Sequence, residues 1–317
     1  MSPRLLPHES DRPFLTDGGL ETTLLFHEKI DLPCFASFHL LRTEAGEEKI
    51  RHYYRTHAGI AHRQGVGFIF ESPSWRANPD WGQRLGYSPA ALAEANHRSV
   101  TLMHETRAEW ETPEFPSLVS GCVGPRGDGF RPSALMTARE AAAYHSPQLR
   151  TFRDAGADLV SAMTINYVAE AIGIARAAAA LDLAAVISFT LETDGNLPGG
   201  ESLGEAIEAV DAASERPPAY YMLNCVHPGH FVDALPEGAP WLDRIRGLRA
   251  NASRLSHAEL DESTELDDGD PRELADQYRE LRRTLTQLQV YGGCCGTDHR
   301  HVAAIGEACL GSKPART

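Results

Sequence analysis

The fold follows from a short strand-like run and the glycine-rich turn after it, which read Leu288-Gln289-Val290-Tyr291 and then Gly292-Gly293-Cys294-Cys295-Gly296-Thr297. Neighbouring side chains of a regular strand point to opposite faces, so two adjacent thiols normally cannot reach one partner. Glycines on both sides relax the φ/ψ limits, which lets the chain turn until both sulfurs reach one point. This segment therefore predicts a strand that ends in a pair of thiolate ligands.

A third soft ligand follows another strand-like run. Residues 220–223 are followed directly by Asn224 and Cys225. Two strand ends that deliver three thiolates to one place indicate a zinc ion held by Cys225, Cys294 and Cys295. The alternatives are a redox pair with a separate core thiol, and a closed structural zinc site, which normally needs a fourth protein ligand.

The remaining cysteines and two nearby histidines are weaker candidates for ligands. We expect Cys34, Cys122 and Cys309 to be small, buried apolar residues. His299 and His301 follow the cysteine pair closely, but a residue typical of a helix N-cap precedes them. We therefore expect both histidines in the first turn of a helix.

Strand-like runs alternate with helical runs along the chain. The strand-like runs cover residues 14–16, 66–71, 117–121, 158–163, 185–190, 220–225, 245–250 and 288–291. The helical runs cover residues 44–64, 89–110, 137–155, 168–181, 202–213, 272–287 and 301–310, with a short segment after Pro228. Such alternation implies parallel strands joined by right-handed crossovers. Eight such units predict an α/β fold, a single (β/α)8 TIM barrel, and no linker divides residues 1–317 into further domains.

In such a barrel the active site lies where the strands end. The residues at the predicted strand ends are Asp17, Glu71, Met163, Thr190, Cys225, Asn251 and Cys294. The thiol ligands therefore converge on one mouth of the barrel. The acidic run over residues 259–270 follows the seventh strand, so it should overhang this mouth, where we expect a solvated face.

Composition excludes several classes of partner. The chain has 317 residues, a net charge of −14 and a pI of about 5.4, which argues against nucleic acid and anionic membranes. No apolar run approaches the roughly 20 residues needed to span a bilayer, and the N-terminus lacks the apolar region of a signal peptide. We expect a cytoplasmic protein whose partners are small molecules; a homo-oligomer is compatible with these features.

Several motifs resemble those of the homocysteine S-methyltransferase family, zinc-dependent (β/α)8 barrels that include betaine-, S-methylmethionine- and cobalamin-linked enzymes. The motifs are Asp17-Gly18-Gly19, Gly124-Pro125, Ser188-Phe189-Thr190, Asn224-Cys225 and Gly292-Gly293-Cys294-Cys295-Gly296. The resemblance covers about residues 14–310. It implies zinc on Cys225, Cys294 and Cys295, and homocysteine as the methyl acceptor.

The resemblance also suggests substrate-binding residues. The amides of Gly18 and Gly19 would bind the amino-acid end of the substrate, with Asp17 facing its ammonium, although these residues also suit a tight turn. Family members commonly carry a glutamate at the end of strand four, where this chain has Met163. We expect Glu71 to take its place, with Asp17 as the second candidate; the alternative is that Glu71 is a solvated loop residue.

Three further residues complete the expected substrate site. They are Trp75, Thr190 and Asn224. Trp75 stands where family members commonly place a tyrosine, and its ring face could hold an onium methyl carrier.

These features predict a zinc-dependent methyltransferase that acts on the thiol of homocysteine and gives methionine. A free thiol has a pKa of about 8.5, and only the thiolate attacks carbon well. Among donors we favour a small onium compound, S-methylmethionine first, with S-adenosylmethionine and betaine also compatible. The alternatives are a barrel with a structural or sensory zinc site and no transferase activity, and a demethylase that uses another thiol acceptor.

Overall fold

The eight predicted strands close into a barrel in the computed structural model, which describes residues 4–133 and 135–311. The strands are β1 (Phe14–Leu15), β2 (Gly67–Glu71), β3 (Ser117–Val123), β4 (Leu159–Ile165), β5 (Ala185–Phe189), β6 (Tyr220–Asn224), β7 (Ile245–Ala250) and β8 (Val290–Gly293). Each is parallel to its neighbours, and β1 pairs with both β2 and β8. The TIM barrel prediction is confirmed.

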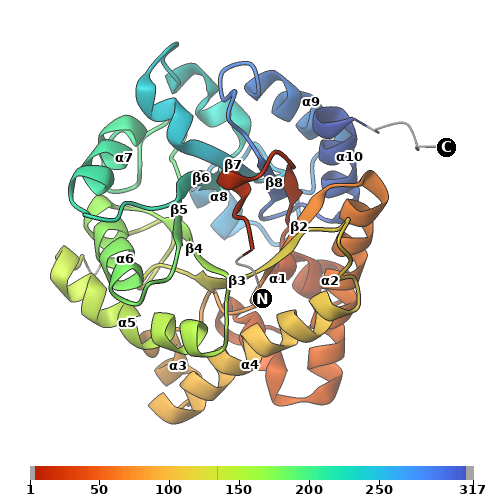
Figure 1. Ribbon diagram of the computed structural model, residues 1–317, viewed down its shortest axis with the longest axis vertical. Helices are drawn as coiled ribbons and strands as arrows, with labels where there is room; N and C mark the ends of the chain where they lie inside the picture. The colour runs from red at the N-terminus through yellow and green to blue at the C-terminus, as the bar shows by residue number, and fades with distance from the viewer. Residues whose placement is uncertain (1–3, 134, 312–317) are drawn as a thin grey trace.

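The helices surround the barrel, as Figure 1 shows. They are α1 (Leu20–Thr22), α2 (Glu44–Gln64), α3 (Pro79–Arg84), α4 (Pro89–Ala108), α5 (Ala138–Asp154), α6 (Val168–Ala180), α7 (Leu203–Ala212), α8 (His257–Glu262), α9 (Pro271–Leu281) and α10 (His299–Leu310). The side chains of Thr43, Ser88, Thr137, Ser202 and Asp298 each cap a helix by accepting a backbone N–H bond. These polar side chains explain why the helices begin where they do.

The largest difference from the predicted helix bounds is in α9, which was expected over residues 272–287 and covers Pro271–Leu281. Helix α4 ends at Ala108 instead of residue 110. Helix α10 begins at His299, in agreement with the expected N-cap before it. Between β6 and β7 the chain forms only short 3-10 turns, beginning with Pro228–His230. The short segment expected there is therefore confirmed.

Strand β4 is longer than predicted, because it continues past Met163 to Ile165. Thr164 has a left-handed backbone, with φ of 62°, and the register with β5 shifts between Ala162 and Ile165. This irregularity is typical of a bulge, which re-aims side chains near active sites. Met163 is buried inside the barrel with Ile69, among other apolar residues.

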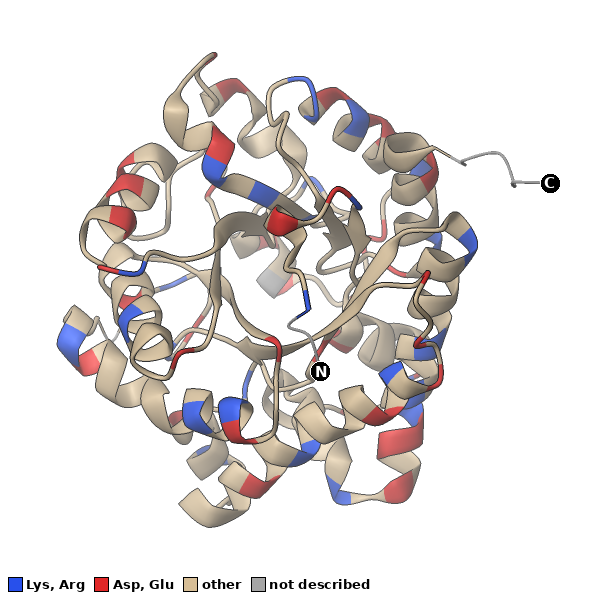
Figure 2. Cartoon of the chain, in the orientation of Figure 1, with Lys and Arg blue, Asp and Glu red and all other residues tan. Residues whose placement is uncertain are grey.

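Charged residues of both signs are interspersed over the outer helices and loops (Figure 2). The barrel centre, in contrast, is filled mainly by apolar side chains. Within the described part of the chain, no helix combines the length and the apolar character that crossing a membrane requires.

Barrel closure depends on the close approach of β8 to the chain just after β1. A Cβ atom added at Gly292 would overlap the Thr16 hydroxyl and lie 2.9 Å from the Asp17 carbonyl oxygen. We therefore expect Gly292→Ala to lower the free energy of unfolding by about 1–3 kcal/mol, as measured by urea denaturation.

The matched control for this change is Gly59→Ala. Gly59 lies inside α2, and its added Cβ would meet its nearest neighbours, side-chain atoms of Arg63 and Trp110, at 3.4 Å. This variant should be as stable as the wild type or gain up to about 1 kcal/mol from better helix propensity. If both variants lose similar stability, the close approach at Gly292 does not limit the fold.

Candidate metal centre and substrate cavity

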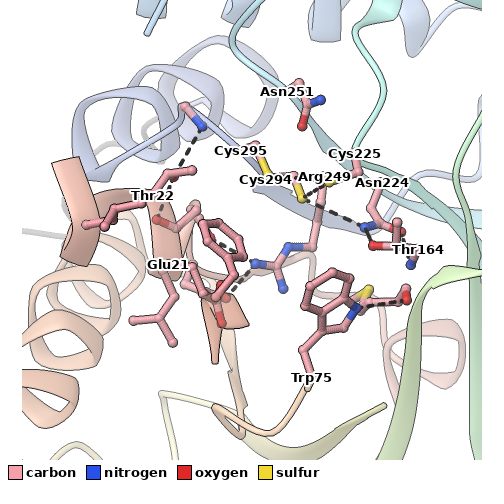
Figure 3. Close-up of a pocket in the computed structure, with 18 of the residues that line it drawn as sticks. Glu21, Thr22, Trp75, Thr164, Asn224, Cys225, Arg249, Asn251, Cys294 and Cys295 are labelled. Atoms are coloured by element: carbon pink, nitrogen blue, oxygen red, sulfur yellow. Dashed lines mark hydrogen bonds and ion pairs between the residues drawn. The ribbon is translucent and has the colours of Figure 1, made fainter. Parts of the chain in front are cut away.

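Three cysteines meet at the mouth of the barrel. Cys225 follows β6, and Cys294 and Cys295 follow β8. The Cys225 sulfur lies 2.8 Å from that of Cys294 and 3.6 Å from that of Cys295, and all three sulfurs lie within 4.8 Å of one another. Figure 3 shows the three thiols together. The predicted convergence is confirmed.

An unusual backbone conformation brings these thiols together. Cys225 has a positive φ of 56°, and Gly296, directly after the cysteine pair, has a φ of 79°. Positive φ is uncommon for residues other than glycine and clusters at functional sites. The Cys225 carbonyl accepts hydrogen bonds from His257 Nε2 at 2.7 Å and from Thr190 Oγ1 at 3.3 Å, which hold this residue in place.

The crowded thiols fit a soft divalent cation. Hydrogen bonds from the Cys225 and Cys295 thiols lower the pKa of Cys294 well below its ordinary value, and the Arg249 charge lowers it further. Among residues 4–133 and 135–311, no fourth histidine, cysteine or carboxylate joins the group. Three thiolates with no fourth protein ligand are typical of a zinc site that keeps one position for a substrate.

A buried arginine holds the surrounding strand ends together. Arg249, on β7, lies 2.9 Å from an Asp17 oxygen and 3.1 Å from a Glu71 oxygen. Its Nε donates to the Gly293 carbonyl at 2.9 Å, and Nη2 donates to the Gly18 carbonyl at 3.1 Å. One guanidinium therefore connects the ends of β1, β2 and β8 to β7.

The cysteines and Arg249 open onto a cavity of about 440 Å³, within the size range of small-molecule sites. Its apolar wall includes Phe26, Phe35 and Phe130. Leu260, Ser263, Glu265, Leu266 and Asp267 also line it. The acidic segment therefore overhangs the mouth as expected, and Glu265 and Asp267 are exposed.

Comparison with known proteins identifies the family. The family model described as homocysteine S-methyltransferase matches residues 14–309. The chain belongs to this family.

Individual members agree with that assignment. A homocysteine S-methyltransferase from Escherichia coli K12 is 26% identical over 248 residues, which cover 73% of this chain and 76% of the relative. Crystal structures of the homocysteine methyltransferase MmuM from Escherichia coli share the fold at 21% identity. The TM-score is 0.74 for the oxidized form, covering 95% of this chain and 97% of that one. It is 0.70 for the metallated form, covering 94% and 96%.

Most of the substrate residues suggested by the resemblance to homocysteine S-methyltransferases line the cavity. They are Asp17, Gly18, Gly19, Glu71, Trp75, Met163 and Asn224. Thr190 does not line it, because its buried hydroxyl faces the Cys225 carbonyl. Thr190 thus supports the metal centre from behind and is placed differently from the expectation.

The expected role of the Gly19 amide is wrong, whereas Asp17 and Glu71 line the cavity but already have a charged protein partner. Arg249 already pairs with both carboxylates, so neither offers an unpaired charge to a substrate ammonium. Burial raises the pKa of Glu71 to about 7 against the opposing effect of Arg249. The Gly19 amide donates to the Thr297 carbonyl at 2.9 Å, and it is therefore not available to a substrate.

Glycine is nevertheless required at position 19 in this homocysteine S-methyltransferase family member. A Cβ atom there would overlap the Thr22 hydroxyl and lie 2.6 Å from the Cys294 carbonyl oxygen. The turn after β1 therefore packs directly against the metal-binding loop.

Asn224 in β6 and Trp75 after β2 both contact β4, although neither β2 nor β6 pairs with it. The Asn224 amide donates to Thr164 Oγ1 at 2.8 Å and lies 3.8 Å from the Cys294 sulfur, so it links the bulge to the metal centre. Trp75 Nε1 donates to the Met163 carbonyl at 3.1 Å. The Arg76 guanidinium lies 4.2 Å from the Trp75 ring centroid, which means that a protein cation already uses part of this ring.

The predictions for the other cysteines and histidines have mixed outcomes. Cys122 and Cys309 are buried as expected, but Cys34 is exposed, so that prediction is wrong. His299 and His301 lie in the first turn of α10 as expected. Neither belongs to the cysteine group.

Sequence reasoning missed Arg249, Glu21 and Arg76, all of which line the cavity. A charged residue close to the C-terminal end of a predicted barrel strand was the available signal for Arg249, because the active site lies at that end. No comparable signal marks the other two, since each lies in the segment that joins one barrel strand to the next.

We expect Arg249→Met to lower the free energy of unfolding by about 3–5 kcal/mol, because it leaves two buried carboxylates without a counter-charge. Arg216→Met is the matched control. Arg216 forms an ion pair with Asp182 in which its own side chain is 62% exposed, so its loss should change the free energy by only about 0–1 kcal/mol. Equal losses in urea denaturation would mean that the buried network does not stabilise the barrel.

Proposed function

We propose that this enzyme transfers a methyl group from a small onium compound, S-methylmethionine first, to the thiol of homocysteine, giving methionine. The observation that carries the proposal is the group of three cysteines at the mouth of a family barrel, open to a cavity of small-molecule size. S-adenosylmethionine and betaine are the other donors to test.

We further propose that Cys225, Cys294 and Cys295 hold zinc. Three thiols within 4.8 Å of one another form a donor set that suits this ion. Zinc bound in this way would supply one open position, at which a substrate thiol is deprotonated at neutral pH. A purely structural site would normally have a fourth protein ligand, and the cysteine group has no such partner among the described residues.

The protein's own residues would position the two reactants. A bond forms between the acceptor sulfur and the methyl carbon while the bond from that carbon to the donor's onium atom breaks, and the donor leaves as a neutral molecule. Such a displacement needs the three atoms in line, which a rigid cavity can favour by holding both reactants. The apolar wall with Phe26, Phe35 and Phe130 would exclude water from the reacting atoms.

Charge and aromatic content support a cationic donor. Trp75 and three phenylalanines line the cavity, and aromatic faces attract onium groups. Glu265 and Asp267 add exposed negative charge at the same mouth. Met163, also in the lining, stands where family members commonly carry a glutamate, and this replacement keeps a different thiol acceptor as the second candidate.

We expect the wild type to bind one zinc per chain and Cys225→Ala to lose most of the metal and the methyl transfer, while circular dichroism shows a folded barrel. Cys309→Ala is the control, since Cys309 is buried in α10 outside the cysteine group; it should keep both metal and activity. A chelator should abolish transfer and added zinc restore it. Full activity in Cys225→Ala would contradict the ligand assignment.

We expect methyl transfer to homocysteine to be fastest from S-methylmethionine in a panel that also contains S-adenosylmethionine, betaine, dimethylsulfoniopropionate and methylcobalamin. The physical reason is the aromatic and acidic lining, which suits a compact cation. Formation of methionine is the readout. Transfer from methylcobalamin alone would reverse the donor proposal, and bound zinc without transfer from any donor would favour a structural or sensory site.

A further inference from the structure

Glu21 is a carboxylate of the cavity that the Arg249 network does not neutralise. Glu21 lies in α1 and lines the cavity. Its Oε1 accepts a hydrogen bond from the Ser37 hydroxyl at 2.7 Å, but no ion pair joins it to a Lys, Arg or His among the described residues. Burial raises the pKa of this carboxyl group. Glu21 therefore differs from Asp17 and Glu71, whose charges Arg249 balances.

Arg76 is a cation in the same cavity and forms no ion pair in the described part of the chain. The Arg76 guanidinium lies 4.2 Å from the Trp75 ring centroid and 4.1 Å from that of Trp81. Its Nη1 donates to the Gly127 carbonyl at 2.6 Å, while its Nε is buried without a partner. No carboxylate of the described chain forms an ion pair with it. The two aromatic rings thus fix a planar donor group whose hydrogen bonds are incomplete.

Glu21 and Arg76 form no ion pair, but the charge of Glu21 affects the pKa of Arg76. Burial lowers the pKa of Arg76 to about 10, and the charges of Asp128 and Glu21 oppose this effect. Leaving two opposite charges unpaired in a cavity that excludes water is unfavourable. An α-amino acid carries an ammonium and a carboxylate on one carbon, so a single head group can satisfy both charges at once.

We propose that Glu21 and Arg76 together bind the α-amino-acid head group of a substrate, with Glu21 accepting from its ammonium and Arg76 donating to its carboxylate. This inference rests on the proposed function and names how that same cavity selects its substrate. Glu21 would supply a carboxylate for the substrate ammonium, which Met163 cannot do. Asp17 and Glu71 already form ion pairs with Arg249. Figure 3 shows Glu21 and Trp75, the neighbour of Arg76, on either side of Arg249 in this view.

Asp128 is the competing carboxylate in the lining. Its Oδ1 accepts from the backbone amides of Phe130 and Arg131, at 2.8 and 2.9 Å. This side chain therefore shapes its own loop, and Asp128→Asn keeps an oxygen acceptor there. It is a matched control for the loss of one negative charge from the cavity.

The test compares three thiols by calorimetric binding to the zinc-loaded protein. Homocysteine carries both charged groups, 4-mercaptobutyrate lacks the ammonium, and 3-aminopropanethiol lacks the carboxylate. Glu21→Gln should weaken homocysteine binding about 10- to 100-fold, the range expected for a charge-assisted hydrogen bond, and change 4-mercaptobutyrate binding by less than about 3-fold. Arg76→Met should weaken homocysteine and 4-mercaptobutyrate and spare 3-aminopropanethiol.

Two control variants test whether a change in binding comes from a general loss of structure in the cavity. Asp128→Asn should leave the preference among the three thiols within about 3-fold of wild type. Arg76→Lys keeps the charge and should retain part of the preference for a carboxylate. If Asp128→Asn alone removes the preference for the ammonium, the assignment of Glu21 is overturned.

The same variants should be tested with the donors, because S-methylmethionine carries the same head group as homocysteine. Here 4-(dimethylsulfonio)butyrate lacks only the ammonium, and (3-aminopropyl)dimethylsulfonium lacks only the carboxylate. Selective losses with donors but not with thiols would assign the head group to the donor, which still supports the pair. Equal losses for each ligand and its truncated analogue, in both series, would overturn the proposal. Selective binding without methyl transfer would contradict the proposed function and leave this pair standing.

Discussion

The ion-pair network of Arg249 is the interaction on which the rest of this mouth depends. Its guanidinium reaches Asp17, Glu71 and two backbone carbonyls, so it joins β7 to the ends of β1, β2 and β8. Strand β1 contains only two residues, which gives it few ladder hydrogen bonds of its own. A buried charge is stable only when it is well paired, and the network therefore fixes where these strand ends lie.

Because of this network, the charged groups of the cavity have different roles. Arg249 balances Asp17 and Glu71, and its charge also helps to lower the pKa of Cys294. Asp17 and Glu71 therefore carry no unpaired charge. Glu21 and Arg76 line the same cavity outside this network, as do the cysteine thiols. The proposed metal site and the proposed head-group site share no side chain, so each could change without the other.

Much of this architecture follows from sequence, for reasons that are local or positional. The alternation of strand-like and helical runs predicts the barrel. Because the active site of such a barrel lies where its strands end, Cys225 and Cys294 are expected to meet although 69 residues separate them. Pairing across the barrel is different. Glu71 ends its strand as expected, but its partner Arg249 is 178 residues away, and no local pattern specifies which side chains meet there. For the same reason, the sequence did not predict the Glu71–Arg249 pair or the hydrogen bond from the Gly19 amide to Thr297.

The difference between the barrel strands and the connections that follow them also explains why the sequence identity to relatives is low. The cysteines stand at the ends of β6 and β8, on either side of the strand that carries Arg249, so the metal centre is tied to the barrel itself and tolerates little change. Connections after the strands are less constrained, since they run over the mouth and add their side chains from outside. A glutamate lost from strand four can therefore be replaced by one in α1 without moving a strand. Recognition of an amino acid needs two opposite charges in one cavity, and Glu21 and Arg76, which both line this cavity, are the pair proposed for it.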